Sequence, residues 1–214
     1  MIIDCISDLH GHYPKLEGGD LLIVAGDLTA RDTTNEYFLM FQFLKNKNYE
    51  KIIIIGGNHD NSFLDGYTLG FSLDSCEYIE YLCDSGTEYE GLKIWGSPWT
   101  CKFEGQNRNC MAFTCDTDAE LCEKWEMIPE NVDILITHNP PHGILDILPK
   151  KGEITGSISL RHHVIGRIKP KLHIFGHIHE HGGKTVDCIV TKFINCSHVN
   201  ERYEPVNKPI RIIL

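Results

Sequence analysis

Short apolar segments, each about as long as one β-strand, recur along the whole chain. In chain order they read MIIDCI, LLIVAG, IIIIGG, LKIWGS, VDILITH, LHIFGH, VDCIVTKFINC and IRIIL. Most of them lack alternating polar positions, which is typical of strands buried on both faces. Between them, apolar residues spaced three or four apart predict a helix over residues 33–48. An acidic start followed by apolar residues predicts a second over 116–128, and a serine in capping position with Pro170 beyond the end predicts a third over 157–169.

Strands that alternate with helices predict a layered α/β fold with a largely buried sheet. The last apolar segments follow one another closely, so we expect antiparallel pairing near the C-terminus. The chain contains no repeat, low-complexity tract or Pro/Gly/Ser-rich linker. We therefore expect one domain over residues 1–214, in which residues 97–130 are available as a lid or loop insertion.

Polar residues with metal-binding side chains follow five of the apolar segments. They are Asp8 and His10, Asp27, Asn58 with His59 and Asp60, His138, and His177 with His179. The carboxyl ends of strands in α/β sheets form the crevices where ligands bind, so we expect these side chains to converge. A turn explains a single Asp or Asn after a strand, but not five strand ends of the same kind.

The expected ligands combine two carboxylates, one amide oxygen and four imidazoles: Asp8, Asp27, Asn58, His10, His138, His177 and His179. A mixed oxygen and nitrogen set without thiolate suits Mn, Fe, Zn, Ni or Mg, and we expect Mn first. Seven ligands exceed the shell of one ion but fit two divalent ions that share a carboxylate. Such a pair can clamp the attacking and leaving oxygens of a displacement at phosphorus.

Composition and charge limit the partners. The chain has 42% hydrophobic and 23% charged residues, which is ordinary for a globular protein, and its formal net charge is −10. That charge argues against stable nucleic-acid binding, while two divalent ions would locally offset the repulsion of a phosphate substrate. The first residues carry no signal-peptide pattern and no apolar run approaches the ~20 residues of a membrane span, so we expect a cytoplasmic protein.

The nine cysteines form no C-x-x-C pair, and we expect reduced thiols that act as small buried hydrophobes. Cys5, Cys188 and Cys196 lie inside apolar segments and fit this interpretation. A second, structural metal is the alternative for four clustered cysteines, although their spacing matches no zinc pattern: Cys101, Cys110, Cys115 and Cys122.

Five motifs resemble the signature blocks of the calcineurin-like metallophosphoesterases: DLH at 8–10, GD at 26–27, GNHD at 57–60, TH at 137–138 and GHIH at 176–179. Other segments are similar to the metallophosphoesterase-domain-containing branch of that family: SPWT at 97–100, IPENVDILITHNPPHGILD at 128–146, KPKLHIFGHIHE at 169–180 and the closing NKPI. This second similarity covers most of the chain from residue 90 onward.

The resemblance implies a two-sheet mixed β-sandwich flanked by helices, in four layers. It also implies that one ion is held by Asp8, His10, Asp27 and His179, and the other by Asp27, Asn58, His138 and His177. Asp27 would bridge the two ions. Some members of the branch lack the imidazole at the position of His177, so its presence favours a complete dinuclear site. Asn139 stands where many relatives have glycine.

The expected reaction is hydrolysis by a water that bridges the two ions. Such a water loses its proton near neutral pH and attacks, while the ions take up charge on the phosphoryl oxygens. The resemblance gives His59 the role of protonating the leaving oxygen, which suits an imidazole. Asp60 either orients His59 or caps a helix after the strand.

These features predict a phosphodiesterase that acts on a small diester, such as a cyclic nucleotide, as the branch resemblance suggests. One alternative is a phosphomonoesterase or protein phosphatase, although the extra cations that a dianionic phosphate needs are few. Another is a metal-bound nucleotide sensor with little turnover, which His59 and His177 argue against. A nuclease is disfavoured by the net charge. The oligomeric state is not predicted.

Several other residues carry two interpretations. Three histidines near the expected ligands either line the substrate cleft or sit in exposed loops: His12, His142 and His181. Arg108 either meets a phosphate or is a solvated surface residue. His173 lies inside a predicted strand and is expected to be structural. Trp95 and Trp99 are expected to pack rather than to stack on a nucleobase.

Overall fold

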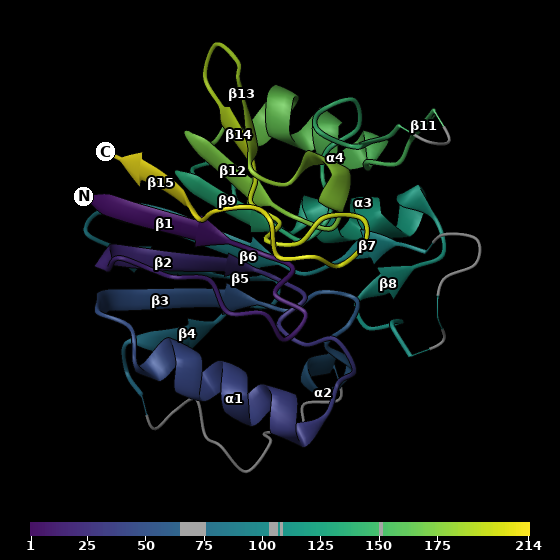
Figure 1. Cartoon of the computed structure of the whole chain (residues 1–214). Coiled ribbons are helices and arrows are strands. Elements are labelled where there is room, and N and C mark those ends of the chain that lie inside the picture. Colours follow the sequence, from purple (N-terminus) through teal and green to yellow (C-terminus); the bar gives the residue numbers. More distant parts are fainter. Residues whose placement is uncertain (65–75, 103–106, 108, 150–151) are drawn as a thin grey trace.

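The fold is a sandwich of two β-sheets. The computed structural model describes residues 1–64, 76–102, 107, 109–149 and 152–214. Its two large sheets stack face to face, and helices cover the outer face of each (Figure 1). The arrangement confirms the mixed, four-layer α/β sandwich that the resemblance implied.

The first sheet has the strand order β15-β1-β2-β3-β4. Its strands are β1 (Ile2–Ile6), β2 (Gly19–Ala25), β3 (Tyr49–Ile55), β4 (Ile79–Tyr81) and β15 (Ile210–Ile213). The first four run parallel, and β15 pairs antiparallel with β1. Parallel pairing brings the carboxyl ends of β1, β2 and β3 to one edge of the sheet.

The second sheet has the order β13-β14-β12-β9-β6-β5. Its strands are β5 (Ser85–Tyr89), β6 (Leu92–Ser97), β9 (Ile134–Thr137), β12 (Leu172–Phe175), β13 (Lys184–Asp187) and β14 (Lys192–Asn195). The four central strands are parallel, and both outer pairs are antiparallel hairpins. The antiparallel pairing expected near the C-terminus is therefore confirmed for β13, β14 and β15. Two short pairs lie apart: β7 (Thr100–Cys101) with β8 (Thr114–Cys115), and β10 (Ile147–Leu148) with β11 (Glu153–Ile154).

The core between the sheets is made of branched aliphatic side chains from both. Ile53 and Ile55 of β3 belong to the same buried cluster as Ile136 of β9 and Ile174 of β12. The opposite face of each central strand is buried as well, because helices cover it. The continuous isoleucine run of β3 follows from this double burial, which removes about 25 cal/mol of unfavourable hydration per Å² of apolar surface.

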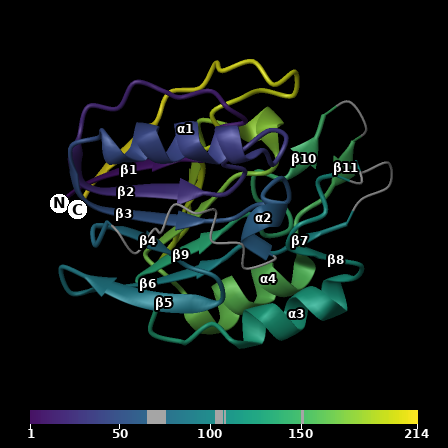
Figure 2. The same ribbon diagram turned by 90° about the horizontal axis from the view of Figure 1, so that it is seen from below.

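Helices form the two outer layers (Figure 2). Helix α1 (Thr34–Lys45) packs on the first sheet, and α3 (Asp118–Glu126) and α4 (Ile158–His163) pack on the second. Thr33 and Thr117 begin α1 and α3 with reciprocal capping boxes. A short helix, α2 (Asn61–Leu64), follows β3. Within the described ranges, no helix has the length and apolar content needed to cross a membrane.

Two predicted elements differ in detail. The helix expected over 157–169 is split, because α4 gives way to a π-helical turn over Val164–Ile168 that ends in left-handed backbone at Lys169. The apolar run 186–196 is a hairpin, since the Cys188 amide donates to the Thr191 carbonyl between β13 and β14. Cys188 is therefore exposed, and its predicted burial was wrong; Cys5 and Cys196 are buried as expected.

Candidate metal centre

The carboxyl ends of five strands meet at one edge of the sandwich. Asp8, Asp27 and Asn58 follow β1, β2 and β3 of the first sheet. His138 follows β9, and His177 and His179 follow β12, in the second sheet. The sheets are joined here by a bridge between Ser7 and Ser197, next to Asp8.

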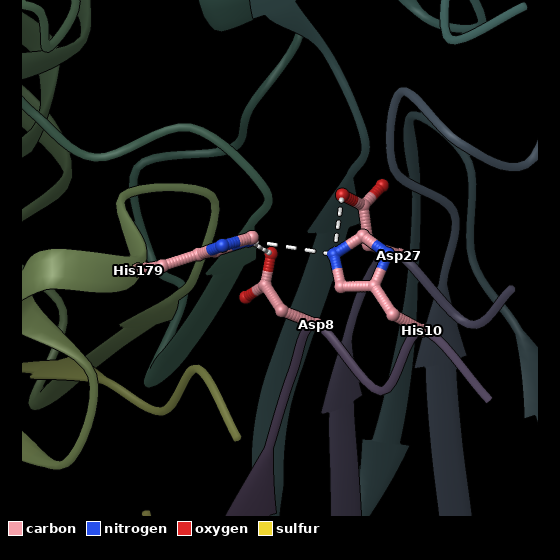
Figure 3. Close-up of side chains that lie close together, drawn as sticks. All are labelled: Asp8, His10, Asp27 and His179. Atoms are coloured by element: carbon pink, nitrogen blue, oxygen red, sulfur yellow. Dashed lines mark hydrogen bonds and ion pairs between the residues drawn. The ribbon is translucent and has the colours of Figure 1, made fainter. Parts of the chain in front are cut away.

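One set of four residues is close enough to hold an ion (Figure 3). One ligand atom from each of Asp8, His10, Asp27 and His179 lies within 4.8 Å of all the others. The Nε2 atoms of His10 and His179 are 3.4 Å apart, and His179 Nε2 is 3.1 Å from Asp8 Oδ1. All four side chains are nearly or fully buried. Two imidazoles and two carboxylates directed at one point form the donor set of a divalent cation.

A second set lies on the other side of Asp27. His138 Nε2 is 3.2 Å from Asn58 Oδ1 and 3.4 Å from Asp27 Oδ1. His138 Nδ1 donates a hydrogen bond to the Ala25 carbonyl at 2.9 Å, so Nε2 is the nitrogen that faces Asp27 and Asn58. The rings of His138 and His177 are 5.0 Å apart, centre to centre. The structure thus brings all seven expected ligands into one region.

The two sets influence each other electrostatically. Burial alone would raise the pKa of Asp27 and Asp8, but the neighbouring imidazoles hold the pKa of both carboxyls below the usual value. Burial alone would lower the pKa of His138, but Asp27 raises it to about 9. The ionised carboxylates therefore attract positive charge to this buried region. Without a metal, the His138 imidazole supplies that charge by holding a proton, and a bound metal ion would displace the proton.

Several of these residues have a backbone that L-amino acids rarely adopt. Asp8, His10, Asp27 and His177 have φ values of 51°, 43°, 51° and 66°. Left-handed backbone at non-glycine residues persists only where the surroundings enforce it, and such positions cluster at functional sites. Gly26 also has positive φ, and a Cβ there would lie 2.5 Å from His138 Nδ1. Only glycine allows the chain after β2 to pass this close to the imidazole.

His59 lies beside both sets. Its Nδ1 is 3.0 Å from the Ala30 carbonyl, to which it donates, so Nε2 faces the site, 4.0 Å from Asp27 Oδ2. Its backbone amide donates to Asp27 Oδ1 at 2.9 Å. The thiol of Cys110 lies 3.4 Å from His59 Nδ1. These contacts hold the ring in one orientation.

Asp60 is fully buried and contacts backbone rather than the His59 ring. Its carboxylate accepts hydrogen bonds from the amides of Gly57, Leu28 and Thr29, at 2.9–3.1 Å. These contacts tie the loop after β2 to the loop after β3. Burial, followed by the nearby charge of Asp27, raises the pKa of Asp60 to about 7. The side chain neither caps α2 nor, among the described residues, bonds to the His59 imidazole.

Other contacts at the site were not predicted from the sequence. Ser197 donates to Asp8 Oδ2 at 2.5 Å, and the His177 amide donates to the same carboxylate. The Thr100 hydroxyl lies 3.2 Å from His177 Nε2 and donates to Asn139 Oδ1 at 2.9 Å. Asn139 therefore holds Thr100 against an expected ligand. No local pattern marks these residues, because they reach the site only through the fold.

A cavity of about 680 Å³ opens over the expected ligands. Its described lining includes Asp27, Asn58, His59, Asn139, His177 and His179, together with Lys102, Leu148, Glu153, Glu180, Glu201 and Tyr203. This volume is in the range of pockets for small molecules. His12, His142 and His181 are not among these residues; all three are partly exposed, and His181 ends a 3-10 helix over His179–His181.

The remaining predictions concern the tryptophans, the clustered cysteines, Arg108 and the expected lid. Trp99 packs on Phe113 and Lys124, and Trp95 packs in the core beneath α3, as expected. In the part of the chain that the structure describes, the clustered cysteines do not form a group of three or more metal-binding side chains. Arg108 lies outside the described residues. Helix α3 falls inside the expected lid but belongs to the outer layer, with Trp125 fully buried.

Comparisons with known proteins agree with this geometry. The sequence pattern of the calcineurin-like phosphoesterases matches residues 1–181. Metallophosphoesterase domain-containing protein 1 of Homo sapiens is 36% identical over 233 residues, covering 98% of this chain and 70% of that protein. UPF0046 protein T07D4.2 of Caenorhabditis elegans is 34% identical over 236 residues, covering 96% of this chain and 58% of that protein.

Solved structures show the same fold at low sequence identity. TT1561 of Thermus thermophilus matches with a TM-score of 0.65 and 16% identity, over 93% of this chain and 89% of that one. Phosphopantetheinyl hydrolase from Mycobacterium tuberculosis matches with a TM-score of 0.59 and 17% identity, over 99% and 95%. The chain therefore belongs to the calcineurin-like phosphoesterase family, and within it to the metallophosphoesterase-domain-containing branch.

Proposed function

We propose that the chain is a dinuclear-metal phosphodiesterase that hydrolyses a small diester, with cyclic nucleotides as the favoured class. One observation carries this proposal. The two oxygens of Asp27 face different ligand sets: Oδ2 is 3.6 Å from His10 Nε2, and Oδ1 is 3.4 Å from His138 Nε2. A carboxylate in this position suits a pair of ions that share one ligand.

In this proposal the first ion is held by Asp8, His10, Asp27 and His179, and the second by Asp27, Asn58, His138 and His177. When bound, such a pair supplies an activated water as nucleophile and stabilises the charge that grows on the phosphoryl oxygens. The donor set suits Mn, and also Fe, Zn, Ni or Mg. Hydrogen bonds to Ala25 and Thr100 would fix which nitrogen of His138 and of His177 faces the metals.

The protein's own residues would handle the leaving group. His59 directs Nε2 into the cavity because Nδ1 is held by the Ala30 carbonyl, so Nε2 is the atom that would carry a proton to the leaving oxygen. Asp60 would act as a positioning residue, since it fixes the loop that presents His59 and Asn58.

The charge around the cavity favours a diester over a monoester. Among the described lining residues the only Lys or Arg is Lys102, whose amine lies 3.1 Å from Asp116. Glu180 contributes a carboxylate to the same rim. A monoester near neutral pH is a dianion and gains more from additional cations than a diester monoanion does. The cavity volume suits a compact substrate.

Residues 109–113, inside the expected lid, pack against the chain that follows β3. Asn61 Nδ2 donates to the Asn109 carbonyl at 2.6 Å, and the Ala112 amide donates to the Asn58 carbonyl at 3.2 Å. In this proposal the chain acts as one domain, and this segment supports the loop that carries Asn58 and His59.

The test is a substrate panel with purified protein. Bis(p-nitrophenyl) phosphate, p-nitrophenyl phosphate, and 2′,3′- and 3′,5′-cyclic nucleotides are assayed with each candidate metal. We expect metal-dependent hydrolysis with a higher kcat/KM for diesters. A higher kcat/KM for monoesters would support a phosphatase instead, and tight nucleotide binding without turnover under any metal would support a sensor.

A further inference from the structure

One aromatic side chain stands against three imidazoles of the site. The ring of Tyr203 lies 4.9 Å from that of His10, 5.2 Å from that of His179 and 6.5 Å from that of His59, centre to centre. Tyr203 also lines the cavity over the expected ligands, and half of its surface, 50%, is exposed. A large aromatic surface is therefore open to a ligand beside the residue expected to protonate the leaving group.

The backbone conformation of the turn at position 203 does not favour a tyrosine. Its φ is 61°, a left-handed conformation that glycine and asparagine adopt more readily. The turn is held by Asn200, whose side-chain oxygen accepts from the amides of Arg202 and Glu204, and whose carbonyl accepts from the Tyr203 amide. A bulky residue in such a conformation is a reason to look for a function of its side chain.

Core packing does not explain Tyr203 either. It belongs to none of the hydrophobic clusters formed by the described residues. It lies in the segment between β14 and β15, which Figure 1 shows as the yellow trace running past the carboxyl ends of the first sheet's strands. This segment follows the part of the chain, residues 1–181, that matches the family pattern. The tyrosine is thus placed over the centre from outside the shared motifs.

We propose that Tyr203 is a specificity-determining residue that stacks on a planar aromatic group of the substrate, either a nucleobase or an aryl ester. This inference rests on the proposed phosphodiesterase function, because it places that group beside the phosphate that the metals would hold. Aromatic rings pair with centroids 4.5–7 Å apart, and stacking on an aromatic side chain tolerates different bases. The cavity of about 680 Å³ has room for such a group.

The test measures binding without turnover. Phenylphosphonate and methylphosphonate carry the same phosphoryl oxygens, and neither contains an ester to hydrolyse. Calorimetry with the Mn²⁺-loaded protein compares their affinities for the unchanged protein, Tyr203→Leu and Tyr203→Phe. We expect Tyr203→Leu to bind phenylphosphonate about ten-fold more weakly and methylphosphonate unchanged, which is the range of one lost stacking contact. Tyr203→Phe keeps the ring and should keep the preference.

Three outcomes would overturn the proposal. Equal weakening of both ligands in Tyr203→Leu would show that Tyr203 acts through His10 and His179 instead. No change in either ligand would show that the ring is not used, and loss of the preference in Tyr203→Phe would assign the effect to the hydroxyl. Elemental analysis of each variant shows whether its metals are retained. A failure of the unchanged protein to hydrolyse any diester would overturn the proposed function but leave this binding comparison intact.

Discussion

The two sheets contribute different chemistry to the same edge. The strand ends of the first sheet carry the expected oxygen ligands Asp8, Asp27 and Asn58, and those of the second sheet carry the imidazoles of His138, His177 and His179. His10, after β1, is the single expected nitrogen ligand on the first side. Neither sheet alone carries a complete set for either proposed ion, so the proposed centre depends on the closed sandwich.

Two buried histidines of the second sheet show how a carboxylate from the first sheet changes the pKa of an imidazole. His138 faces Asp27 of the first sheet, and its pKa is raised to about 9. His173, on β12, is equally buried but contacts Thr137 and two phenylalanines, and burial lowers its pKa to about 3. The nearby carboxylate of Asp27 therefore accounts for the difference in pKa between these two buried histidines.

The largest expected effect comes from removing the carboxylate that both ligand sets share. Asp27→Ala should abolish hydrolysis and lower the bound Mn²⁺ from two ions per chain to at most one, because each set loses a ligand. Elemental analysis after dialysis and a bis(p-nitrophenyl) phosphate assay measure this. Asp187→Ala, at an exposed aspartate paired with Lys192, is the control and should change neither. Full metal content in Asp27→Ala would contradict the shared role.

The second effect separates proton transfer from metal binding. His59→Ala should lower kcat by roughly 10²–10³-fold, because the leaving oxygen loses its proton donor, while two ions stay bound. The loss should be smaller for p-nitrophenolate than for an alkoxide leaving group, which needs protonation more. His12→Ala, outside the cavity, serves as the control. If the variant binds less metal, His59 is a ligand and this assignment is wrong.

The third effect tests the contrast between the two buried histidines. The pKa of His173 is about 3 in the folded chain and about 6.5 when unfolded, so protonation favours the unfolded state below pH 6.5. Its neutral form thus stabilises fully above pH 6.5, and this contribution is lost as the pH falls toward 3. The drop in unfolding free energy from pH 7 to pH 5 should be about 2 kcal/mol smaller in His173→Phe.

Denaturant titrations at both pH values measure this drop. His162→Ala, which removes an exposed histidine, is the control. Its drop in unfolding free energy from pH 7 to pH 5 should equal that of the unchanged protein. An equal drop in His173→Phe and the unchanged protein would mean that His173 takes up its proton without unfolding.

The smallest effect concerns support for a ligand from the second sheet. Thr100→Val removes the hydroxyl between His177 and Asn139, and should weaken the binding of one of the two ions by about ten-fold. Thr100→Ser keeps the hydroxyl and should bind both ions normally. Calorimetric Mn²⁺ titration measures both variants. Equal affinities in the two would mean that the hydroxyl does not orient His177.

The convergence of the expected ligands could be predicted from the sequence because their signal is local. Each expected ligand lies within a few residues of the end of an apolar strand, and parallel pairing brings such ends together. The helices over 33–48 and 116–128 were also predicted well, since apolar spacing and an acidic helix start are local signals; the structure adds capping boxes at Thr33 and Thr117. Strand β5, with the sequence SGTEY, was missed because its polar alternation is too weak to indicate a strand.

The supporting residues could not be predicted in this way. Ser197 reaches Asp8 across 189 positions of sequence, and Thr100 reaches His177 across 77. Tyr203 depends on a left-handed turn that its own residue type disfavours. The role of Asp60 was also open, because the same residue after a strand can cap a helix, orient a neighbour or, as here, bind the amides of a second loop.

Anomalous diffraction from Mn²⁺-soaked crystals would locate the two ions proposed to lie on either side of Asp27. Two peaks about 3.5–4 Å apart are expected. One should contact Asp8, His10 and His179, the other Asn58, His138 and His177, and both Asp27. A single peak, or peaks away from Asp27, would contradict this arrangement.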